Sequence, residues 1–194
     1  VFRRFSMSTL KVDNLLLSNN DSGTGRILEM VGGVCDGSSM TTLSGTYTFE
    51  NVTAKQTLST SYVDQTGSLI NYKPPEGTKR VIYESYFHIM TVDAHPIGHH
   101  RLYVDGAEVE AARVTYAAED IQGRVSFKWM FTVGSSADNV NYGKFRTWTT
   151  LKEIKIQVRQ YGTGNEYDLH STNHWDGSGT DIFSVPMLFI TAIG

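Results

Sequence analysis

Three histidines lie close together in this 194-residue chain, and histidine is a common ligand for zinc and a proton carrier near neutral pH. The segment "DAHPIGHHRLYVD" contains His95, His99 and His100. Pro96 and Gly98 indicate a loop tip, and no helical pattern aligns two of the histidines on one face. We therefore expect an exposed polar loop that contacts a partner, and we assign no metal and no cofactor to the chain.

The segment "HWDGSGTD", residues 174–181, has a superficial likeness to a calcium-binding loop because it offers side-chain oxygens at alternate positions. An EF-hand loop requires glycine at its sixth position and glutamate at its twelfth, where this chain has Asp181 and Met187. We expect a connecting loop in which Trp175 serves as a packing or ligand platform.

Candidate catalytic groups are sparse. Glu108 and Glu110 share one face of a predicted strand, at a spacing compatible with glycoside hydrolysis, but they follow an Asp-Gly turn and should lie in solvent. Cys35 lies between glycines without a base in a recognisable partner motif. We expect a protein that is not an enzyme. The first alternative is a carbohydrate-binding module that recognises a receptor, and the second is an enzyme that cleaves glycans with these two glutamates.

Aromatic residues are frequent in the two longest predicted loops, residues 134–149 and 171–182. Tyrosine and tryptophan present a flat apolar face with a polar edge, which suits stacking on sugars. The candidates for ligand contact are Tyr142, Phe145, Trp148 and Trp175. The alternative is that these side chains cap the ends of a β-barrel or sandwich.

The composition limits the possible partners. The formal net charge of -3 and the absence of clustered lysine and arginine, apart from Arg3 and Arg4, argue against nucleic acid as a partner. No apolar run approaches the roughly 20 residues that span a bilayer. The single cysteine excludes an intrachain disulfide, so stability must come from packing or from association with other chains.

Alternation of apolar and polar residues is the main structural signal. In "VSFKWMFTV", residues 125–133, every second side chain from Val125 is apolar, and "TLKEIKIQVRQY" directs Ile154, Ile156 and Val158 to one face. "RVIYESYFHIM" shows the same pattern. The Asp105-Gly106 pair between two alternating segments predicts a hairpin.

These patterns predict an all-β fold, an antiparallel jelly-roll sandwich of eight to ten strands over residues 46–194. So many strands must close or stack to avoid unpaired edges. Residues 1–45 are too irregular for a domain and too apolar for a linker, so we expect an N-terminal arm that becomes ordered against its own sandwich or against neighbouring subunits.

Two stretches resemble virion proteins. The segment "MSTLKVDNLLLSNNDSGTG" resembles the start of tail-fibre and other virion structural proteins of marine phages. The stretches "TSYVDQTGSLINYKPPEGTKRVIYESYFHI", "RLYVDGAEV" and "FSVPMLFITAIG" resemble the trimeric jelly-roll heads of phage fibres and capsid appendages, and also the C1q and tumour-necrosis-factor folds.

The resemblance implies a homotrimeric structural subunit of a virion, assembled in the host cytoplasm. Residues 8–45 would contact other virion proteins, and the sandwich would face outward, where a host surface glycan is a further expected partner. The apolar last strand would lie inside a sheet, covered on one face by the core and on the other by sister subunits. Pro186 should interrupt that strand, because proline cannot donate a ladder hydrogen bond.

Overall fold

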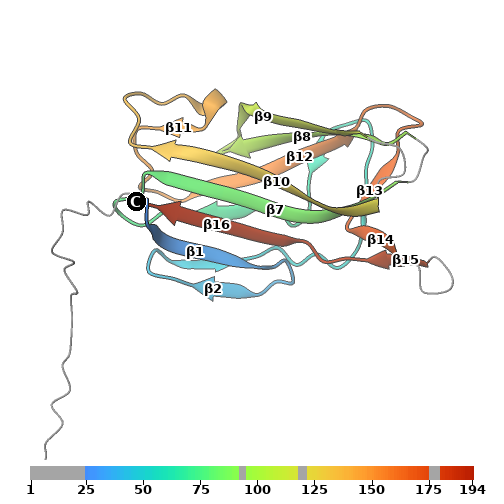
Figure 1. Cartoon of the computed structure of the whole chain (residues 1–194), viewed down its shortest axis with the longest axis horizontal. Helices are drawn as coiled ribbons and strands as arrows, with labels where there is room; N and C mark the ends of the chain where they lie inside the picture. The colour runs from blue at the N-terminus through green and yellow to red at the C-terminus, as the bar shows by residue number, and fades with distance from the viewer. Residues whose placement is uncertain (1–24, 92–94, 118–121, 175–179) are drawn as a thin grey trace, which may run out of the picture.

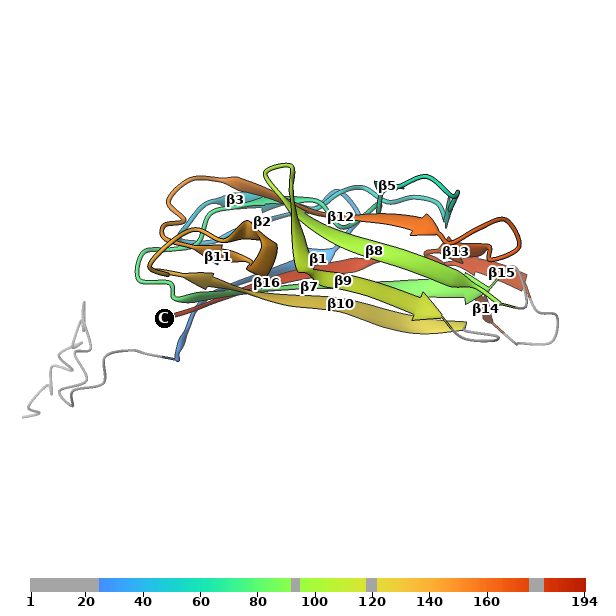
Figure 2. The same ribbon diagram turned by 90° about the horizontal axis from the view of Figure 1, so that it is seen from above.

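Strands dominate the computed structural model, which describes residues 25–91, 95–117, 122–174 and 180–194. They form two facing layers (Figures 1 and 2). The larger sheet has the strand order β1-β16-β7-β10-β11; β13 pairs with the last residues of β7, and β4 pairs with β13. Its strands are β1 (Ile27–Val34), β4 (Gln56–Thr57), β7 (Arg80–Thr91), β10 (Gln122–Val133), β11 (Lys144–Phe145), β13 (Tyr167–Leu169) and β16 (Met187–Ile193).

The smaller sheet has the order β5-β12-β8-β9, and β6 continues the place of β5 beside β12. Two further hairpins, β2-β3 and β14-β15, and one short 3-10 helix complete the described elements. The strands of the smaller sheet and these remaining elements are β2 (Ser39–Thr41), β3 (Thr46–Thr48), β5 (Val63–Asp64), β6 (Ile70–Tyr72), β8 (Ile97–Val104), β9 (Ala107–Ala117), η1 (Val140–Tyr142), β12 (Lys152–Gln160), β14 (Ser171–His174) and β15 (Thr180–Phe183).

The connectivity is that of a jelly roll, as the sequence predicts. The first and last long strands, β1 and β16, pair with each other and share a sheet with β7 and β10. Strands β5, β6, β8, β9 and β12 form the facing sheet. All ladders among the long strands are antiparallel. Short connections such as the Asp105-Gly106 turn, with both residues at positive φ, close the hairpins.

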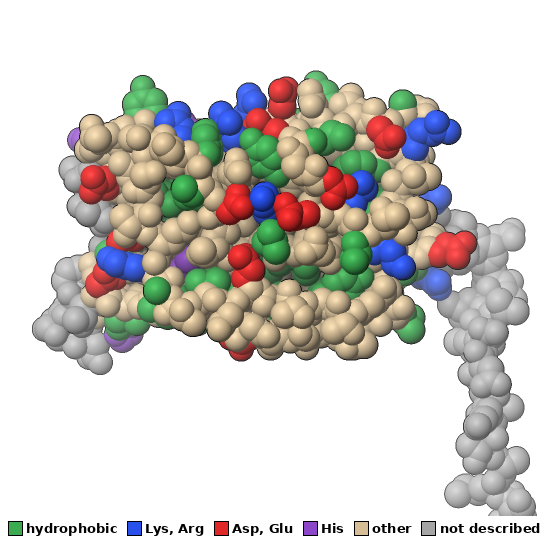
Figure 3. Space-filling model, turned by 180° about the vertical axis from the view of Figure 1, so that it is seen from behind, with side chains coloured by type: hydrophobic (Ala, Val, Ile, Leu, Met, Phe, Trp, Pro, Cys, Tyr) green, Lys and Arg blue, Asp and Glu red, His purple; other side chains and the backbone are tan. Residues whose placement is uncertain are grey.

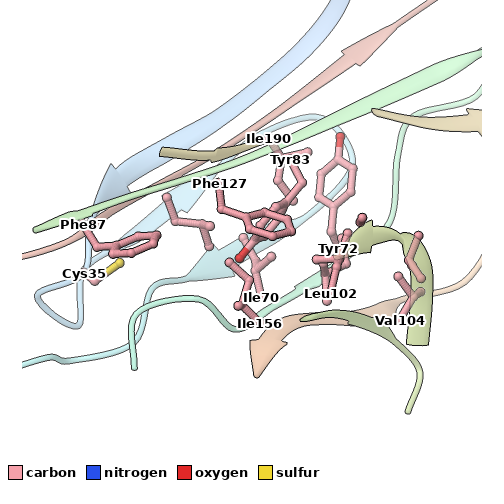
Figure 4. Close-up of a cluster of buried hydrophobic side chains, with 14 of the residues drawn as sticks. Cys35, Ile70, Tyr72, Tyr83, Phe87, Leu102, Val104, Phe127, Ile156 and Ile190 are labelled. Carbon is pink, nitrogen blue, oxygen red and sulfur yellow. The ribbon is translucent and has the colours of Figure 1, made fainter. Parts of the chain in front are cut away.

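The predicted alternation sets which side chains enter the core. Val125, Phe127, Phe131 and their alternate neighbours face inward from β10, and Ile154, Ile156 and Val158 are fully buried on β12. Figure 4 shows the centre of this core, where side chains from both layers meet. Its labelled residues are Cys35, Ile70, Tyr72, Tyr83, Phe87, Leu102, Val104, Phe127, Ile156 and Ile190.

The terminal strand β16 lies between β1 and β7, as the apolar C-terminal sequence predicts. Leu188, Ile190 and Ala192 point into the core, and the alternate side chains of this strand form part of the opposite, outer face. Pro186 precedes the strand and stands outside its ladder, where its carbonyl accepts a hydrogen bond from the Cys35 amide at 2.9 Å. The expected interruption at Pro186 is therefore present.

Part of the predicted arm belongs to the sandwich. Strand β1 pairs with β16 over most of its length, and Val31 and Cys35 are fully buried in the core. Residues 27–34 are therefore a structural strand of this chain, which is one of the two roles expected for the arm. Residues 1–24 lie outside the described residues. In the described part of the chain we find no helix long and apolar enough to cross a membrane.

Candidate functional site

The predicted histidine loop is a strand, so this part of the sequence interpretation is wrong. His99 and His100 lie within β8, which is paired on one side with β12 and on the other with β9. Because neighbouring residues of a strand point to opposite faces, His100 enters the core and His99 faces outward. His95 is exposed just before the strand. The three rings therefore do not converge on one site.

His100 is a buried neutral histidine. Its Nδ1 lies 3.1 Å from Gln65 Oε1 and its Nε2 lies 2.9 Å from the Tyr167 hydroxyl, so both ring nitrogens are occupied. Burial lowers the pKa of His100 to about 3. Among the described residues no group of His, Cys, Asp and Glu is arranged to hold a metal ion.

The aromatic candidates separate into buried and exposed residues. Trp148 is only 3% exposed, and its Nε1 donates to the Tyr72 carbonyl at 3.1 Å. Its ring packs edge-on against Phe131 and Phe145, so Trp148 caps one end of the core instead of offering its face to a ligand. Tyr142 is 59% exposed and remains accessible. Trp175 lies outside the described residues.

The paired glutamates form ion pairs with arginine. Glu108 accepts two hydrogen bonds from the Arg113 guanidinium, at 2.6 and 3.1 Å, and this pairing lowers the Glu108 pKa. A general acid for glycoside cleavage requires the opposite shift. Glu110 hydrogen-bonds to Asn141 at 3.3 Å.

Cys35 is likewise unsuited to nucleophilic catalysis. Its side chain is fully buried and donates a hydrogen bond to the Gly67 carbonyl at 3.3 Å. Burial, with Glu50 and Asp36 nearby, raises the pKa of the Cys35 thiol to about 12. The thiolate that nucleophilic chemistry requires is therefore scarce at neutral pH.

The most unusual surface is the outer face of the larger sheet, formed by the side chains of β1, β16, β7 and β10 that point away from the core. Outward positions of a water-facing strand are normally polar. Here they include several large apolar side chains, which we call the apolar face: Met30, Val34, Ile82, Tyr86, Met130, Met187 and Phe189. Glu84, Lys128, Ser126 and Thr191 point outward among them. Met30, Val34 and Met130 are 50%, 41% and 47% exposed.

Cross-strand contacts order the centre of the apolar face. Phe189 packs edge-on against Tyr86, with the ring centroids 5.8 Å apart. The Tyr86 hydroxyl donates to Glu84 Oε1 at 3.2 Å, and Glu84 also pairs with Lys128 at 2.9 Å. Glu84, Tyr86 and Phe189 line an open groove of ≈ 430 Å³ together with Met30, Arg124, Met187 and Thr191.

The outer face of the smaller sheet is polar by contrast. Acidic and basic side chains intermingle across it, on the side of the molecule seen in Figure 3. Lys155 pairs with Asp64 at 2.9 Å, and the guanidinium groups of Arg101 and Arg159 lie 3.9 and 5.2 Å from the Tyr62 ring centre. This sheet face is suited to water, and the apolar face is not.

Comparison with known proteins gives no family assignment. No protein-family profile matches the chain, and no curated protein matches it in sequence. Among solved structures, the sugar-binding C-terminal domain of EclA aligns over 86% of both chains at 9% identity and a TM-score of 0.32. The VP2 subviral particle of infectious bursal disease virus aligns over 97% of this chain and 42% of its own, at 11% identity and a TM-score of 0.36.

A mannanase from Podospora anserina with a GH26-CBM35 architecture aligns over 85% of this chain and 28% of its own, at 11% identity and a TM-score of 0.31. The chain thus spans less than half the length of the VP2 and mannanase chains. Similarity at these values assigns neither a family nor a function.

Proposed function

We propose that this chain is a non-enzymatic structural subunit that associates with copies of itself through the apolar face of its larger sheet. The observation that carries the proposal is the contrast between the outer face of the smaller sheet, where ion pairs predominate, and that of the larger sheet, where Met30, Val34 and Met130 are exposed around one ion pair. Soluble proteins that act alone rarely expose a contiguous apolar surface of this kind, and such surfaces usually mark sites of association.

A second copy is the occupant that best fits this face. The apolar residues surround a Glu84–Lys128 pair, so the same surface offers both an acceptor and a donor to its symmetry mate. In a closed trimer such contacts are heterologous, so the carboxylate of one subunit can meet the ammonium group of the next, and homo-oligomer interfaces commonly have apolar centres. In the trimer that the sequence resemblance implies, β16 would be covered by the core on one side and by sister subunits on the other.

The virion is the proposed location, and its support is the resemblance of residues 7–25 to the start of phage virion proteins. In this proposal, residues 8–45 also contact other virion proteins. Within that segment, β1 is paired with β16 of its own sandwich. Assembly is driven by burial of apolar surface, as in obligate interfaces.

Charge placed on the apolar face tests the proposal. Met30→Asp and Met130→Asp each put a carboxylate at a half-exposed position on β1 or β10. We expect both variants to sediment as smaller species than the wild type while circular dichroism remains unchanged. Leu151→Asp, which makes the same kind of change at a 62% exposed position outside the apolar face, is the matched control and should assemble as the wild type does.

Two results would overturn the proposal. One is wild-type assembly by both face variants. The other is an equal loss of assembly in the Leu151→Asp control, since that would mean that any added surface charge disrupts association.

A further inference from the structure

A second candidate site lies at the end of the sandwich that carries the C-terminus and β11 (Figures 1 and 2). Here the end of β10 and three loops line an open cavity of ≈ 590 Å³, which we call the end cavity. A volume of this size suits a ligand of one or two sugar rings. The segments that line it are residues 43–44, 73–79, 133–134 and 146–149.

Hydrogen bonds hold the walls of the end cavity in place. The Tyr47 hydroxyl donates to the Lys73 carbonyl at 2.8 Å, and the Thr78 hydroxyl donates to the Pro75 carbonyl at 2.7 Å. Trp148 is fixed by its bond to the Tyr72 carbonyl, and the Gly134 amide donates to the Phe145 carbonyl at 2.9 Å. A preformed cavity loses little conformational entropy when a ligand binds.

The cavity gathers unpaired positive charge. Lys73, Lys79 and Arg146 line it together with a single acid, Glu76. None of the three cations forms an ion pair with a described residue, whereas Lys55, Lys128, Lys152 and Lys155 each have a carboxylate partner within 3 Å. Three cations against one acid leave the lining with a net positive charge, which favours a bound anion.

The remaining lining has the mixed character of a sugar site. Hydroxyl groups come from Ser44, Thr147 and Thr149, and apolar surface comes from the adjacent prolines and from Leu43, which is 98% exposed at a hairpin tip. Hydroxyls can bond sugar hydroxyls, and apolar side chains can pack against the C–H faces of a sugar ring. A bare inorganic anion would use only the cations.

We propose that the end cavity binds an acidic saccharide, with its carboxylate or sulfate group held by Lys73, Lys79 and Arg146. The sugar ring lies against the apolar and hydroxyl-bearing wall. This site is separate from the apolar face, and its occupancy does not depend on self-association of the chain.

Titration calorimetry on the full chain tests this inference with four probes: sialyllactose, a sulfated lactose, neutral lactose and sodium sulfate. We expect the two acidic sugars to bind, with affinity falling as salt rises. Their relative affinities identify whether carboxylate or sulfate is preferred. Lactose and sodium sulfate should each bind at least tenfold more weakly, because each lacks half of the contacts.

Arg146→Gln and Lys79→Gln should weaken binding of the acidic sugars by about tenfold or more, since each removes a charged hydrogen-bond donor. Both positions are exposed, and circular dichroism checks that the variants fold. Lys144→Gln is the matched control, because Lys144 is an exposed cation on neighbouring β11 that does not line the cavity. It should bind as the wild type does.

The inference is overturned if no acidic sugar binds at millimolar concentration, or if Lys144→Gln weakens binding as much as Arg146→Gln. It is also overturned if sodium sulfate or lactose binds as tightly as the acidic sugars. Met30→Asp separates this inference from the proposed function, because a dissociated subunit with an intact end cavity should still bind the sugar.

Discussion

Phe189 and Gly32 face each other across β16 and β1, and the Phe189 ring occupies the space in which a Gly32 side chain would stand. The aromatic side chain thus covers the glycine backbone on the outer face of the larger sheet. This contact keeps the Phe189 ring flat on the sheet, where it also meets Tyr86. The shape of the apolar face therefore depends on the absence of a side chain at Gly32.

Gly32→Ala should displace the Phe189 ring. We expect a loss of about 1 to 3 kcal/mol in the free energy of unfolding, from overpacking, together with weaker self-association. Gly123→Ala on β10 is the control, because a Cβ at Gly123 meets nothing within 4 Å. Urea titration of both variants measures the difference, and equal stability of the two would contradict the packing described here.

Two buried histidines should make stability fall with acid. Burial lowers the pKa of His100 to about 3 and that of His170 to about 4, whereas histidine in an unfolded chain titrates near pH 6.5. Below pH 6.5 the unfolded chain therefore binds more protons than the native protein. The contribution of each histidine to the free energy of unfolding is therefore fully present above pH 6.5. It decreases as the pH falls towards 4, by up to about 1.4 kcal/mol per pH unit for each histidine.

His170→Asn isolates one of these groups. His170 has a φ of 62°, a left-handed conformation that asparagine tolerates well, so the backbone should be preserved. We expect a shallower loss of stability between pH 7 and pH 5 than in the wild type, measured by urea titration at each pH. A wild-type protein that is equally stable at pH 7 and pH 5 would refute the effect of burial on these histidines.

Lys55 neutralises a buried carboxylate from a distant part of the chain. Its Nζ lies 2.7 Å from Asp168, whose side chain is 3% exposed, and 2.8 Å from Asp181. Lys55→Met leaves Asp168 without its counter-charge, and we expect a loss of about 1 to 3 kcal/mol in unfolding free energy. Adding Asp168→Asn should restore part of this loss, because the buried charge is then removed.

Lys152→Met is the control for that experiment. Its partner Asp105 is 47% exposed, and water can replace the lost ion pair. We expect little change in its thermal midpoint. If the Lys152 and Lys55 variants have the same thermal midpoint, the loss of stability in Lys55→Met does not come from the burial of Asp168.

Cys35 should be chemically silent in the native protein. Its buried thiol has a pKa raised to about 12, so little thiolate is present at pH 7.5. We expect no labelling by a maleimide in native buffer and stoichiometric labelling in denaturant, both read by mass spectrometry. Fast labelling of the native protein would place the thiol at the surface, in conflict with its position in the core.

The sequence was sufficient to predict the long strands and their connectivity class. Alternation in residues 125–133 and 152–160 is strong because each strand has one face in the core. An Asp-Gly pair between two strands is typical of a tight hairpin turn, which is what Asp105 and Gly106 form. The apolar character of the last residues likewise predicted that the terminal strand lies within a sheet. Its outward residues, Met187 and Phe189, are the sequence signal for the apolar face.

The sequence was less informative where tertiary contacts decide the structure. Pro96 and Gly98 indicate a loop at His99, but pairing with β12 and β9 holds the segment as a strand, and Gly98 makes room for the Tyr167 side chain. The burial of Trp148 depends on Phe131 and Phe145 from other segments. The end cavity was missed for the same reason, since Arg146 comes from a stretch of sequence far from that of Lys73 and Lys79.

The mass of the wild-type protein in solution tests the central claim most directly. Multi-angle light scattering after size exclusion, over a range of concentrations, gives this mass without reference to shape. We predict three times the 21.6 kDa of the chain, with dissociation only on dilution. A mass of 21.6 kDa at every concentration would contradict association through the apolar face.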